Sequence, residues 1–304
     1  MMNVGFSMLP LLGLRDALIV SHFSKINKAC SRSDFVDDLD LAYAVPLNDG
    51  EEIPPIVLHT GTVSDDIQTY SAGEIVTFGI CPHMYLLREL WGYQPQLDSA
   101  IGYGNAMHYC LKRAGELVQE GYSPVSAVTT SVEEDFHMPF VGGIVFDNFK
   151  NSAKKRLVTF SRKYGDDLKR IEEVEYRIEF PINDGGITSA TLMGKVDVIL
   201  KNGGELEVRD YKSSEEARTL SEVSTQVQLY TAGLKTMGRP VSSGSVAYLD
   251  EARVEPVKVT EVHLTEAKKN AQKVVNKITK RKFKPTPGKS CKRCDQNQIC
   301  RWKK

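Results

Sequence analysis

Two strand-like segments joined by a tight glycine turn constrain the fold more than any other feature of this sequence. TLMGKVDVIL, residues 191–200, and LEVRDYKSS, residues 206–214, are connected through KNGG. Apolar runs of this length on either side of such a turn are typical of paired antiparallel strands. EVEYRIEFPI, residues 173–182, alternates apolar and charged residues, as a half-buried strand does. The sequence therefore predicts a sheet built as a meander around residues 173–214.

Helical patterns precede and follow this meander. SAGE at residues 71–74 is typical of a capping box that opens a helix, and Pro82 suits the first turn of a second one. Apolar residues spaced three or four apart predict further helices. We expect helices at about 104–120, within 124–168, at 220–237 and at 265–282, and strands at 243–250 and 254–264. This order predicts an α/β core around a central mixed sheet flanked by helices.

The two strands of the predicted hairpin carry charged residues at unusual places. Asp197 lies in the middle of an apolar strand, where a carboxylate is costly to bury unless it is paired or holds a metal. Asp210 and Lys212 share one face of the next strand. If the strands pair, both carboxylates can converge on Mg²⁺ or Mn²⁺ beside the lysine, which suits phosphodiester hydrolysis. The alternative is two strand-end aspartates and a structural lysine.

Two helical segments contain further candidate residues. His108 follows Gly104 by four residues, and its imidazole is able to complete a metal site. Gln226 and Tyr230 lie four apart on one helical face, from which they are able to reach the active site or a sugar-phosphate backbone. Taken singly, each pattern is more common in ordinary core or surface positions.

The ordered set G-x-x-x-H, G-x-x-D, D-x-K and Q-x-x-x-Y resembles the RecB-type branch of the PD-(D/E)xK nuclease superfamily. The resemblance covers about residues 71–304 and implies a restriction-endonuclease-like core with a helical insertion. It implies a Mg²⁺- or Mn²⁺-dependent nuclease in which His108, Asp197 and Asp210 bind the metal. In the same resemblance Lys212 is the catalytic lysine, and Gln226 and Tyr230 support the site or contact DNA. Cleavage would be direct hydrolysis, without a covalent intermediate.

Cysteines form a second candidate metal site. Three of the six cysteines stand in CKRCDQNQIC, residues 291–300, which suits metal ligation in a reducing compartment better than a disulfide framework. Cys81 is the candidate fourth ligand, whereas Cys30 and Cys110 look unrelated. Four thiolates suit either zinc or an iron–sulphur cluster. A ligand 210 residues before the other three is unusual for zinc knuckles.

The nuclease resemblance extends to this cysteine layout. In its iron–sulphur members, which include AddB-type recombination nucleases and the CRISPR-adaptation nuclease, one cysteine precedes the nuclease motifs and three follow them. The resemblance therefore implies a [4Fe-4S] cluster bound by Cys81, Cys291, Cys294 and Cys300. Such a cluster would clamp the start of the domain to its end, and zinc remains the alternative.

Charge is distributed unevenly along the chain. Residues 266–304 carry 14 Lys or Arg against Glu266 and Asp295, a net of +12, so the other residues carry −12 and the whole chain is neutral. This favours a polyanion partner, most simply DNA, although a solvated helix face gives the same pattern. The predicted nucleic-acid-binding residues are Lys280, Arg281, Lys282, Lys292 and Arg293.

The first 70 residues are expected to lie outside the nuclease domain. GLRDALIVSHFSKIN, residues 13–27, resembles the end of a UvrD-like superfamily 1 helicase motor, so we interpret residues 1–30 as a remnant of one. Residues 31–70 read as a polar linker, and residues 71–304 as the nuclease domain with its cluster. G-x-x-x-x-G-K-[ST] is absent, so we expect no ATPase activity; a separate helicase subunit is a candidate partner.

These features predict a soluble, cytoplasmic DNA nuclease of repair or recombination. No apolar run reaches the roughly 18 residues of a membrane span, and three cysteines crowded together favour a reducing compartment. We expect action on single strands or DNA ends, as an exonuclease rather than an endonuclease. The alternatives are a non-catalytic DNA-binding scaffold subunit of a helicase–nuclease complex, and a nuclease directed at RNA.

Overall fold

The computed structural model describes residues 68–93, 102–182, 190–213 and 219–304. The chain divides into two units, residues 1–66 and 67–304, and every described residue belongs to the second. The predicted helicase remnant at residues 1–30 and the linker up to residue 67 therefore lie outside the described residues. The last positions assigned to that linker, 68–70, belong to a strand of the sheet. None of the described helices is long and apolar enough to cross a membrane.

A mixed sheet of six strands forms the centre of this unit. The strands are β1 (Gln68–Ser71), β2 (Ile171–Ile182), β3 (Ala190–Asn202), β4 (Glu205–Lys212), β5 (Val241–Tyr248) and β6 (Arg253–Val257). Their order is β1-β3-β4-β5-β6, and β2 also pairs with β3. The β1–β3 and β4–β5 pairs are parallel, and the other pairs are antiparallel. The predicted hairpin is confirmed as β3 and β4, with Gly203 at a positive φ of 65° in the turn.

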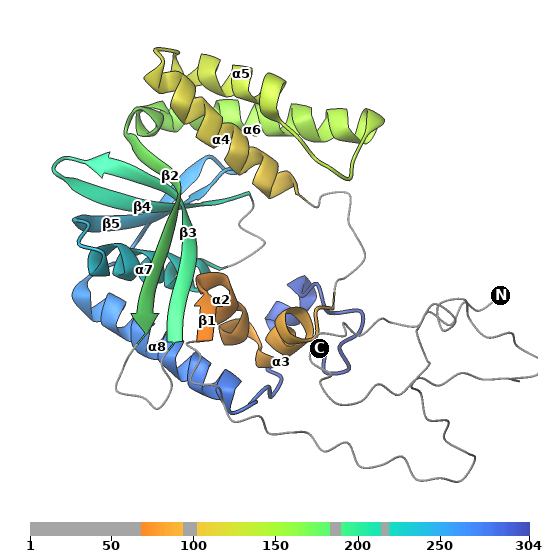
Figure 1. Ribbon diagram of the computed structural model, residues 1–304. Helices are drawn as coiled ribbons and strands as arrows, with labels where there is room; N and C mark the ends of the chain where they lie inside the picture. The colour runs from red at the N-terminus through yellow and green to blue at the C-terminus, as the bar shows by residue number, and fades with distance from the viewer. Residues whose placement is uncertain (1–67, 94–101, 183–189, 214–218) are drawn as a thin grey trace, which may run out of the picture. The chain divides into compact units, whose positions relative to one another are not determined.

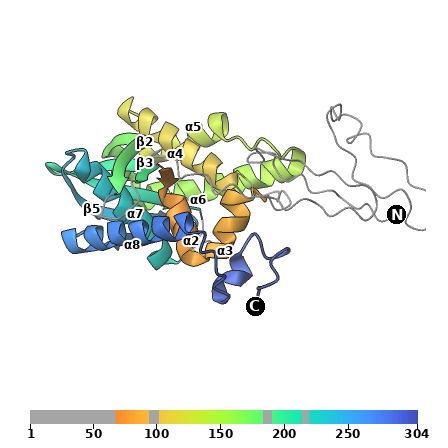
Figure 2. The same ribbon diagram turned by 60° about the horizontal axis from the view of Figure 1, so that its bottom comes forward.

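Helices cover both faces of the sheet (Figures 1 and 2). α4, α5 and α6 lie over one face, and α7 and α8 lie over the other, where α2 joins them. The helices are α2 (Ala72–Ile80), α3 (Pro82–Tyr85), α4 (Tyr103–Gln119), α5 (Pro124–Asp135), α6 (Gly143–Lys169), α7 (Leu220–Thr236) and α8 (Glu261–Thr279), with a π-helical turn η1 (Leu86–Leu90) and a 3₁₀ turn η3 (Lys289–Arg293). The α/β fold class is thus confirmed.

Two apolar cores result from this layering. One contains Leu192, Val208 and Leu229 on the α7 side of the sheet, and the other contains Leu111 and Tyr211 on the α4 side. Because side chains of neighbouring strand residues point to opposite faces, Val208 and Tyr211 of β4 enter different cores. The sheet is therefore buried on both faces, and polar side chains need a break in the packing to reach solvent.

Such a break exists along one edge of β3. β2 pairs with β3 from Ala190 to Leu200. The other edge of β3 is shared, because β1 pairs with residues 190–193 and β4 pairs with residues 198–202. Residues 194–197 lie between these two ladders. Asp197, at the end of that gap, is thus placed where β3 and β4 separate.

Local signals account for most helix starts. Ser71 caps α2: its Oγ accepts from the Glu74 amide at 3.0 Å, while a Glu74 carboxylate oxygen accepts from the Ser71 amide at 2.7 Å, as predicted. Thr219 and Glu222 form the same arrangement at α7. The strand expected at 254–264 is wrong in its second half, because β6 ends at Val257 and α8 begins at Glu261.

Candidate active site

All six side chains predicted for the active site line one cleft between α4 and α7. His108 comes from α4, and Gln226 and Tyr230 come from α7. Of the remaining three, Asp197 comes from the middle of β3, and Asp210 and Lys212 come from the end of β4. Residues that are separated by up to 122 positions in sequence are therefore brought to one place by the hairpin and its two covering helices.

Asp197 continues the β3–β4 ladder with its side chain. The last backbone pair is Val198 with Arg209. Beyond it, the Tyr211 amide donates to Oδ2 of Asp197 at 2.7 Å. A carboxylate thus takes the place of a backbone acceptor at the point where the strands diverge. This contact fixes one oxygen of Asp197 and leaves the other toward His108, whose Nδ1 lies 3.8 Å from Oδ1.

Asp210 and Lys212 form a buried ion pair. Asp210 is only 1% exposed, and Nζ of Lys212 lies 2.6 Å from its Oδ2. Oδ1 of Asp210 has no hydrogen-bond partner among the described residues. A buried carboxylate oxygen without a donor is costly, and a cation in the cleft would satisfy it. The donor set therefore fits a divalent metal ion held by Asp210 and Asp197.

A chain of polar contacts connects the lysine to α7. Nζ of Lys212 donates to Oε1 of Gln226 at 3.4 Å, and Nε2 of Gln226 donates to the Tyr230 hydroxyl at 2.8 Å. Gln226 and Tyr230 therefore contact each other across one helical turn, as their spacing predicts. The arrangement holds the lysine between a carboxylate and an amide oxygen.

The electrostatics of the cleft differ from those of exposed groups. Burial raises the pKa of Asp197 to about 7, and the negative charge of Asp210 adds to the rise. Burial also lowers the pKa of His108 to about 4. Its imidazole is therefore neutral at pH 7, which is the form that is able to ligate a metal. The ring packs edge-on against Tyr211, with 5.9 Å between the ring centroids.

The glycines of the recognised patterns differ in how closely their neighbours pack, and only Gly194 has no room for a side chain. A Cβ added to Gly194 would stand 2.5 Å from Cε1 of Tyr230. A Cβ on Gly104 would meet Oγ of Ser213 at 3.4 Å, one residue beyond the catalytic-lysine candidate. The glycine of G-x-x-D is thus fixed by its contact with α7, whereas the glycine of G-x-x-x-H is in ordinary contact with the residue after Lys212. The sequence contained these glycines but gave no indication of their partners.

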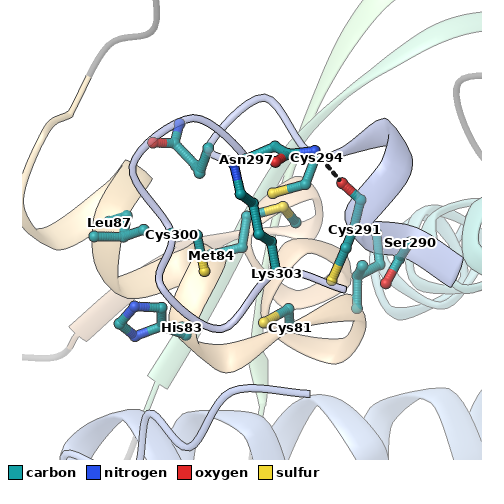
Figure 3. A pocket seen from close by; sticks show the side chains of 12 residues that line it. Cys81, His83, Met84, Leu87, Ser290, Cys291, Cys294, Asn297, Cys300 and Lys303 are labelled. Carbon is teal, nitrogen blue, oxygen red and sulfur yellow. Dashed lines mark hydrogen bonds between the residues drawn. The ribbon is translucent and has the colours of Figure 1, made fainter. Parts of the chain in front are cut away.

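The four predicted cluster cysteines line a second pocket. Cys81, between α2 and α3, lies on one wall, and Cys291, Cys294 and Cys300 come from the C-terminal segment (Figure 3). The remaining lining is largely apolar and includes Met84. Burial raises the pKa of the Cys294 thiol, and a hydrogen bond from the Gly288 amide lowers that of Cys291. Within the described ranges, no three His, Cys, Asp or Glu side chains are grouped as ligands of one metal ion.

Contacts between protein groups alone also connect the C-terminal segment to α2, α3 and η1. Arg88 forms an ion pair with Asp295, and the Thr286 hydroxyl donates to the Ile80 carbonyl at 2.9 Å. Phe283 stacks on Tyr85 with ring centroids 6.2 Å apart. The beginning and the end of the described unit are therefore adjacent, as a cysteine clamp requires.

The predicted nucleic-acid-binding residues lie elsewhere. Lys280, Arg281 and Lys282 follow the end of α8, while Lys292 and Arg293 lie in η3, and all five are exposed. None of the five lines the cleft of Asp210. Nη2 of Arg293 lies 3.6 Å from a carboxylate oxygen of Glu222. The basic surface and the candidate active site are thus separate features.

A mixed sheet between helical layers, with two aspartates and a lysine at a break between strands, defines a nuclease-like α/β protein. Residues 69–301 match the family described as the PD-(D/E)XK nuclease superfamily, and the chain belongs to that superfamily. Membership implies a metal-dependent nuclease, and such enzymes generally use Mg²⁺ or Mn²⁺. The predicted superfamily and fold are thereby confirmed.

Other comparisons add little. A solved structure titled "Crystal structure of SSO0001" is 14% identical in sequence, with a TM-score of 0.40; the match covers 78% of this chain and 87% of that one. No curated protein matches the chain.

Proposed function

We propose that the chain is a Mg²⁺- or Mn²⁺-dependent DNA nuclease of the RecB-type branch. It hydrolyses phosphodiester bonds in single strands or at DNA ends, as an exonuclease rather than an endonuclease, in repair or recombination. The observation that carries the proposal is the shared cleft of Asp197, Asp210 and Lys212, in which Nζ of Lys212 lies 2.6 Å from Oδ2 of Asp210. A non-catalytic scaffold has no need for a buried carboxylate oxygen without a donor beside this lysine.

Each side chain has a defined part in this proposal. A divalent cation held by Asp197, Asp210 and neutral His108 would polarise the scissile phosphate and favour deprotonation of the attacking water. The ammonium group of Lys212 stabilises the negative charge that develops on the phosphate oxygens. Gln226 and Tyr230 hold Lys212 in place through their hydrogen bonds. The Tyr211 amide orients Asp197.

The proposal includes a structural [4Fe-4S] cluster bound by Cys81, Cys291, Cys294 and Cys300. All four thiols line one pocket, although Cys81 is 210 residues before the next. In a four-iron cluster each cysteine binds a different iron, so four thiols spread around a pocket suit it. Zinc is the alternative occupant, and metal analysis distinguishes the two.

The basic residues form a second part of the proposed DNA interface. No acidic residue occurs between Glu266 and Asp295. Lys269, Lys273 and Lys277 recur every four residues on the exposed side of α8. Such a row suits the sugar-phosphate backbone, and Lys280, Arg281, Lys282, Lys292 and Arg293 extend it. A helicase subunit is proposed as a partner from the resemblance of residues 13–27, which lie outside the described residues.

Cleavage of end-labelled single-stranded DNA in Mg²⁺ or Mn²⁺ tests the nuclease proposal. We expect Asp210→Ala and Lys212→Ala each to lower the rate by at least about 100-fold, because each removes a group that acts on the transition state. Asp166→Ala and Lys169→Ala are the matched controls, since this pair is exposed and remote from the cleft. Equal cleavage by all four variants would end the proposal, as would the absence of cleavage by the unaltered chain.

A further inference from the structure

Two aromatic side chains stand exposed on the lining of the active-site cleft. Tyr109 is 51% exposed and Phe140 is 67% exposed, and both belong to the same cleft as Asp197 and Asp210. Exposure of large apolar rings is unfavourable, and contiguous exposed apolar surface commonly marks a binding site. Two exposed rings on the lining of the cleft that contains the carboxylates favour a ligand with apolar faces.

The two rings come from different elements. Tyr109 follows His108 on α4. Phe140 lies in the connection between α5 and α6, at residues 136–142. Neither ring stacks on another aromatic ring in the described part of the chain, whereas the neighbouring Tyr103 and Phe136 pack against each other at 6.2 Å. Thus the exposed pair is set apart from the aromatic core beneath it.

Charged groups around the rings match a strand that carries both bases and phosphates. Lys112 and Lys195 line the cleft together with Glu175. Nζ of Lys195 lies 2.6 Å from a Glu175 oxygen, and Nζ of Lys112 lies 3.5 Å from the other. The cleft thus presents cations, carboxylates suited to a metal and apolar ring faces within one surface. A nucleotide chain has the complementary phosphates and flat base faces.

We propose that Tyr109 and Phe140 are stacking platforms for unpaired bases next to the scissile phosphate. This inference rests on the proposed nuclease function and deepens it by naming the side chains that would bind unpaired bases of the substrate. Bases in a duplex already stack on their neighbours, so only a single strand or a frayed end offers free base faces to these rings. Stacking does not read base identity, because every base has a π-face. The cleft therefore distinguishes single-stranded from double-stranded nucleic acid and does not distinguish one base sequence from another.

The test measures binding without cleavage, in EDTA, with the full chain. Fluorescence anisotropy of labelled oligothymidine is compared with that of an abasic strand of the same length. We expect Tyr109→Ala and Phe140→Ala each to weaken oligothymidine binding by about 5- to 150-fold, the usual range for one stacked base. Tyr109→Trp should retain binding. Tyr122→Ala is the matched control, since Tyr122 is 46% exposed but lies outside the cleft.

The abasic strand separates stacking from a structural role. It should bind the unaltered chain weakly, and the two alanine variants should not weaken its binding further. Oligouridine should show the same dependence on Tyr109 and Phe140, because ring stacking does not read the sugar. Equal binding of oligothymidine and the abasic strand by the unaltered chain would overturn the inference. The inference would also be overturned if Tyr109→Ala and Phe140→Ala weakened the binding of a blunt duplex as much as the binding of oligothymidine.

Failure of the nuclease proposal gives a different result. If Tyr109→Ala and Phe140→Ala weaken the binding of oligothymidine but the unaltered chain cleaves nothing in Mg²⁺ or Mn²⁺, the stacking inference is supported and the nuclease proposal is not. If Asp210→Ala abolishes cleavage while Tyr109→Ala and Phe140→Ala change neither binding nor rate, the nuclease stands and the platforms do not. Thermal unfolding should be nearly unchanged in both alanine variants, because both rings are exposed.

Discussion

At the scale of single residues, Gly194 connects the hairpin to α7. It stands three positions before Asp197, and the Tyr230 ring occupies the space where its side chain would be. Tyr230 in turn accepts from Gln226, which contacts Lys212. Gly194, which has no side chain, thereby leaves the space for the Tyr230 ring. The contacts of Tyr230 with Gln226, and of Gln226 with Lys212, depend on that space.

Gly194→Ala should therefore damage both stability and the site. We expect a loss of about 1 to 3 kcal/mol in the free energy of unfolding, typical of overpacking, together with slower cleavage. Denaturant unfolding and single-strand cleavage check this. In a Tyr230→Ala background the stability cost should disappear. Gly204→Ala is the control, because nothing lies within 4 Å of a Cβ at that position. A full cost in both backgrounds would contradict the proposed contact.

The raised pKa of Asp197 should make the free energy of unfolding depend on pH. Its pKa in the folded chain is about 7, against about 3.9 when unfolded, so folding penalises the ionised form. In metal-free protein the stability contributed by protonated Asp197 is present at low pH and is lost as pH rises from about 4 to 7. Asp197→Asn should remove this loss and be more stable than the unaltered chain by roughly 1 to 3 kcal/mol at pH 8.

Urea unfolding at pH 5 and pH 8 in EDTA measures this difference. The gain for Asp197→Asn should be smaller at pH 5 than at pH 8. Asp166→Asn serves as the control, because Asp166 is exposed and its pKa is lowered by Lys169. A gain that is the same at both pH values would show that Asp197 does not titrate in this range.

The chemistry of individual residues could be predicted from the sequence further than their geometry. A carboxylate in an apolar strand and a D-x-K pattern identified Asp197, Asp210 and Lys212, because burial of charge is costly without a reason. Tyr109 and Phe140 were missed, since an aromatic residue on a helix or loop gives no sign that it is exposed. The hydrogen bond from Tyr211 to Asp197 was missed because its donor is a backbone amide. Every residue except proline has such an amide, so the sequence does not indicate which one is used.

At the scale of elements, a buried arginine joins α6 to the sheet. Arg209 is 3% exposed, and its Nε donates to Oγ of Ser245 on β5 at 2.8 Å. Its Nη2 donates to Oε1 of Glu207 at 2.7 Å, and its Nη1 pairs with Asp167 near the end of α6. The network lies on β4, next to Asp210.

Arg209→Met should be strongly destabilising, by about 3 to 5 kcal/mol, because it removes the buried cation that pairs with Asp167 and Glu207 and leaves only the partly exposed Arg170 beside them. Arg170→Met is the matched control. Arg170 contacts the same Asp167 and Glu207, but its side chain is 35% exposed, so its loss should cost at most about 1 kcal/mol. Thermal or denaturant unfolding compares the two variants. Similar costs for both would mean that the network is effectively solvated.

Element types were more predictable than element boundaries and pairing. The hairpin and the capping box at Ser71 have strong local signals, and the structure has them where they were expected. The start of α8 at Glu261 was missed because VKVTEVHL alternates apolar and polar residues as a strand does. In the structure this segment is helical from Glu261, and Leu264 and Ala267 are buried in the core on the α7 side of the sheet. The gap in the β3 ladder depends on β1, a distant strand of four residues, and no local pattern specifies that pairing.

At the scale of the whole unit, the beginning and the end of the described chain meet at the cysteine pocket. The proposed cluster would add a covalent connection to the Arg88–Asp295 ion pair and the Phe283–Tyr85 stack. Removing the cluster should loosen the C-terminal segment, because the cluster would close the long loop between Cys81 and Cys291. Without it, only contacts such as the Arg88–Asp295 ion pair and the Phe283–Tyr85 stack would hold that segment.

Anaerobically purified protein should contain about four iron atoms per chain. Cys81→Ala should lose them, while Cys110→Ala should retain them, because Cys110 is buried in the other core. Cluster loss should lower the melting temperature and speed amide hydrogen exchange in residues 283–304. Zinc without iron would overturn the cluster proposal and leave the nuclease site intact.

The backbone amide of Tyr211 is a natural NMR probe of the Asp197 carboxylate. Most backbone amides of a sheet donate to other backbone groups, but this one donates to Oδ2 of Asp197 at 2.7 Å. Its proton therefore senses directly whether that carboxylate is protonated, ionised or coordinated. In an NMR spectrum of ¹⁵N-labelled protein, one cross-peak would follow proton loss and cation binding at the same oxygen. β4, the strand that contains Lys212, thus also reports the protonation and cation binding of Asp197, without any label attached to the cleft.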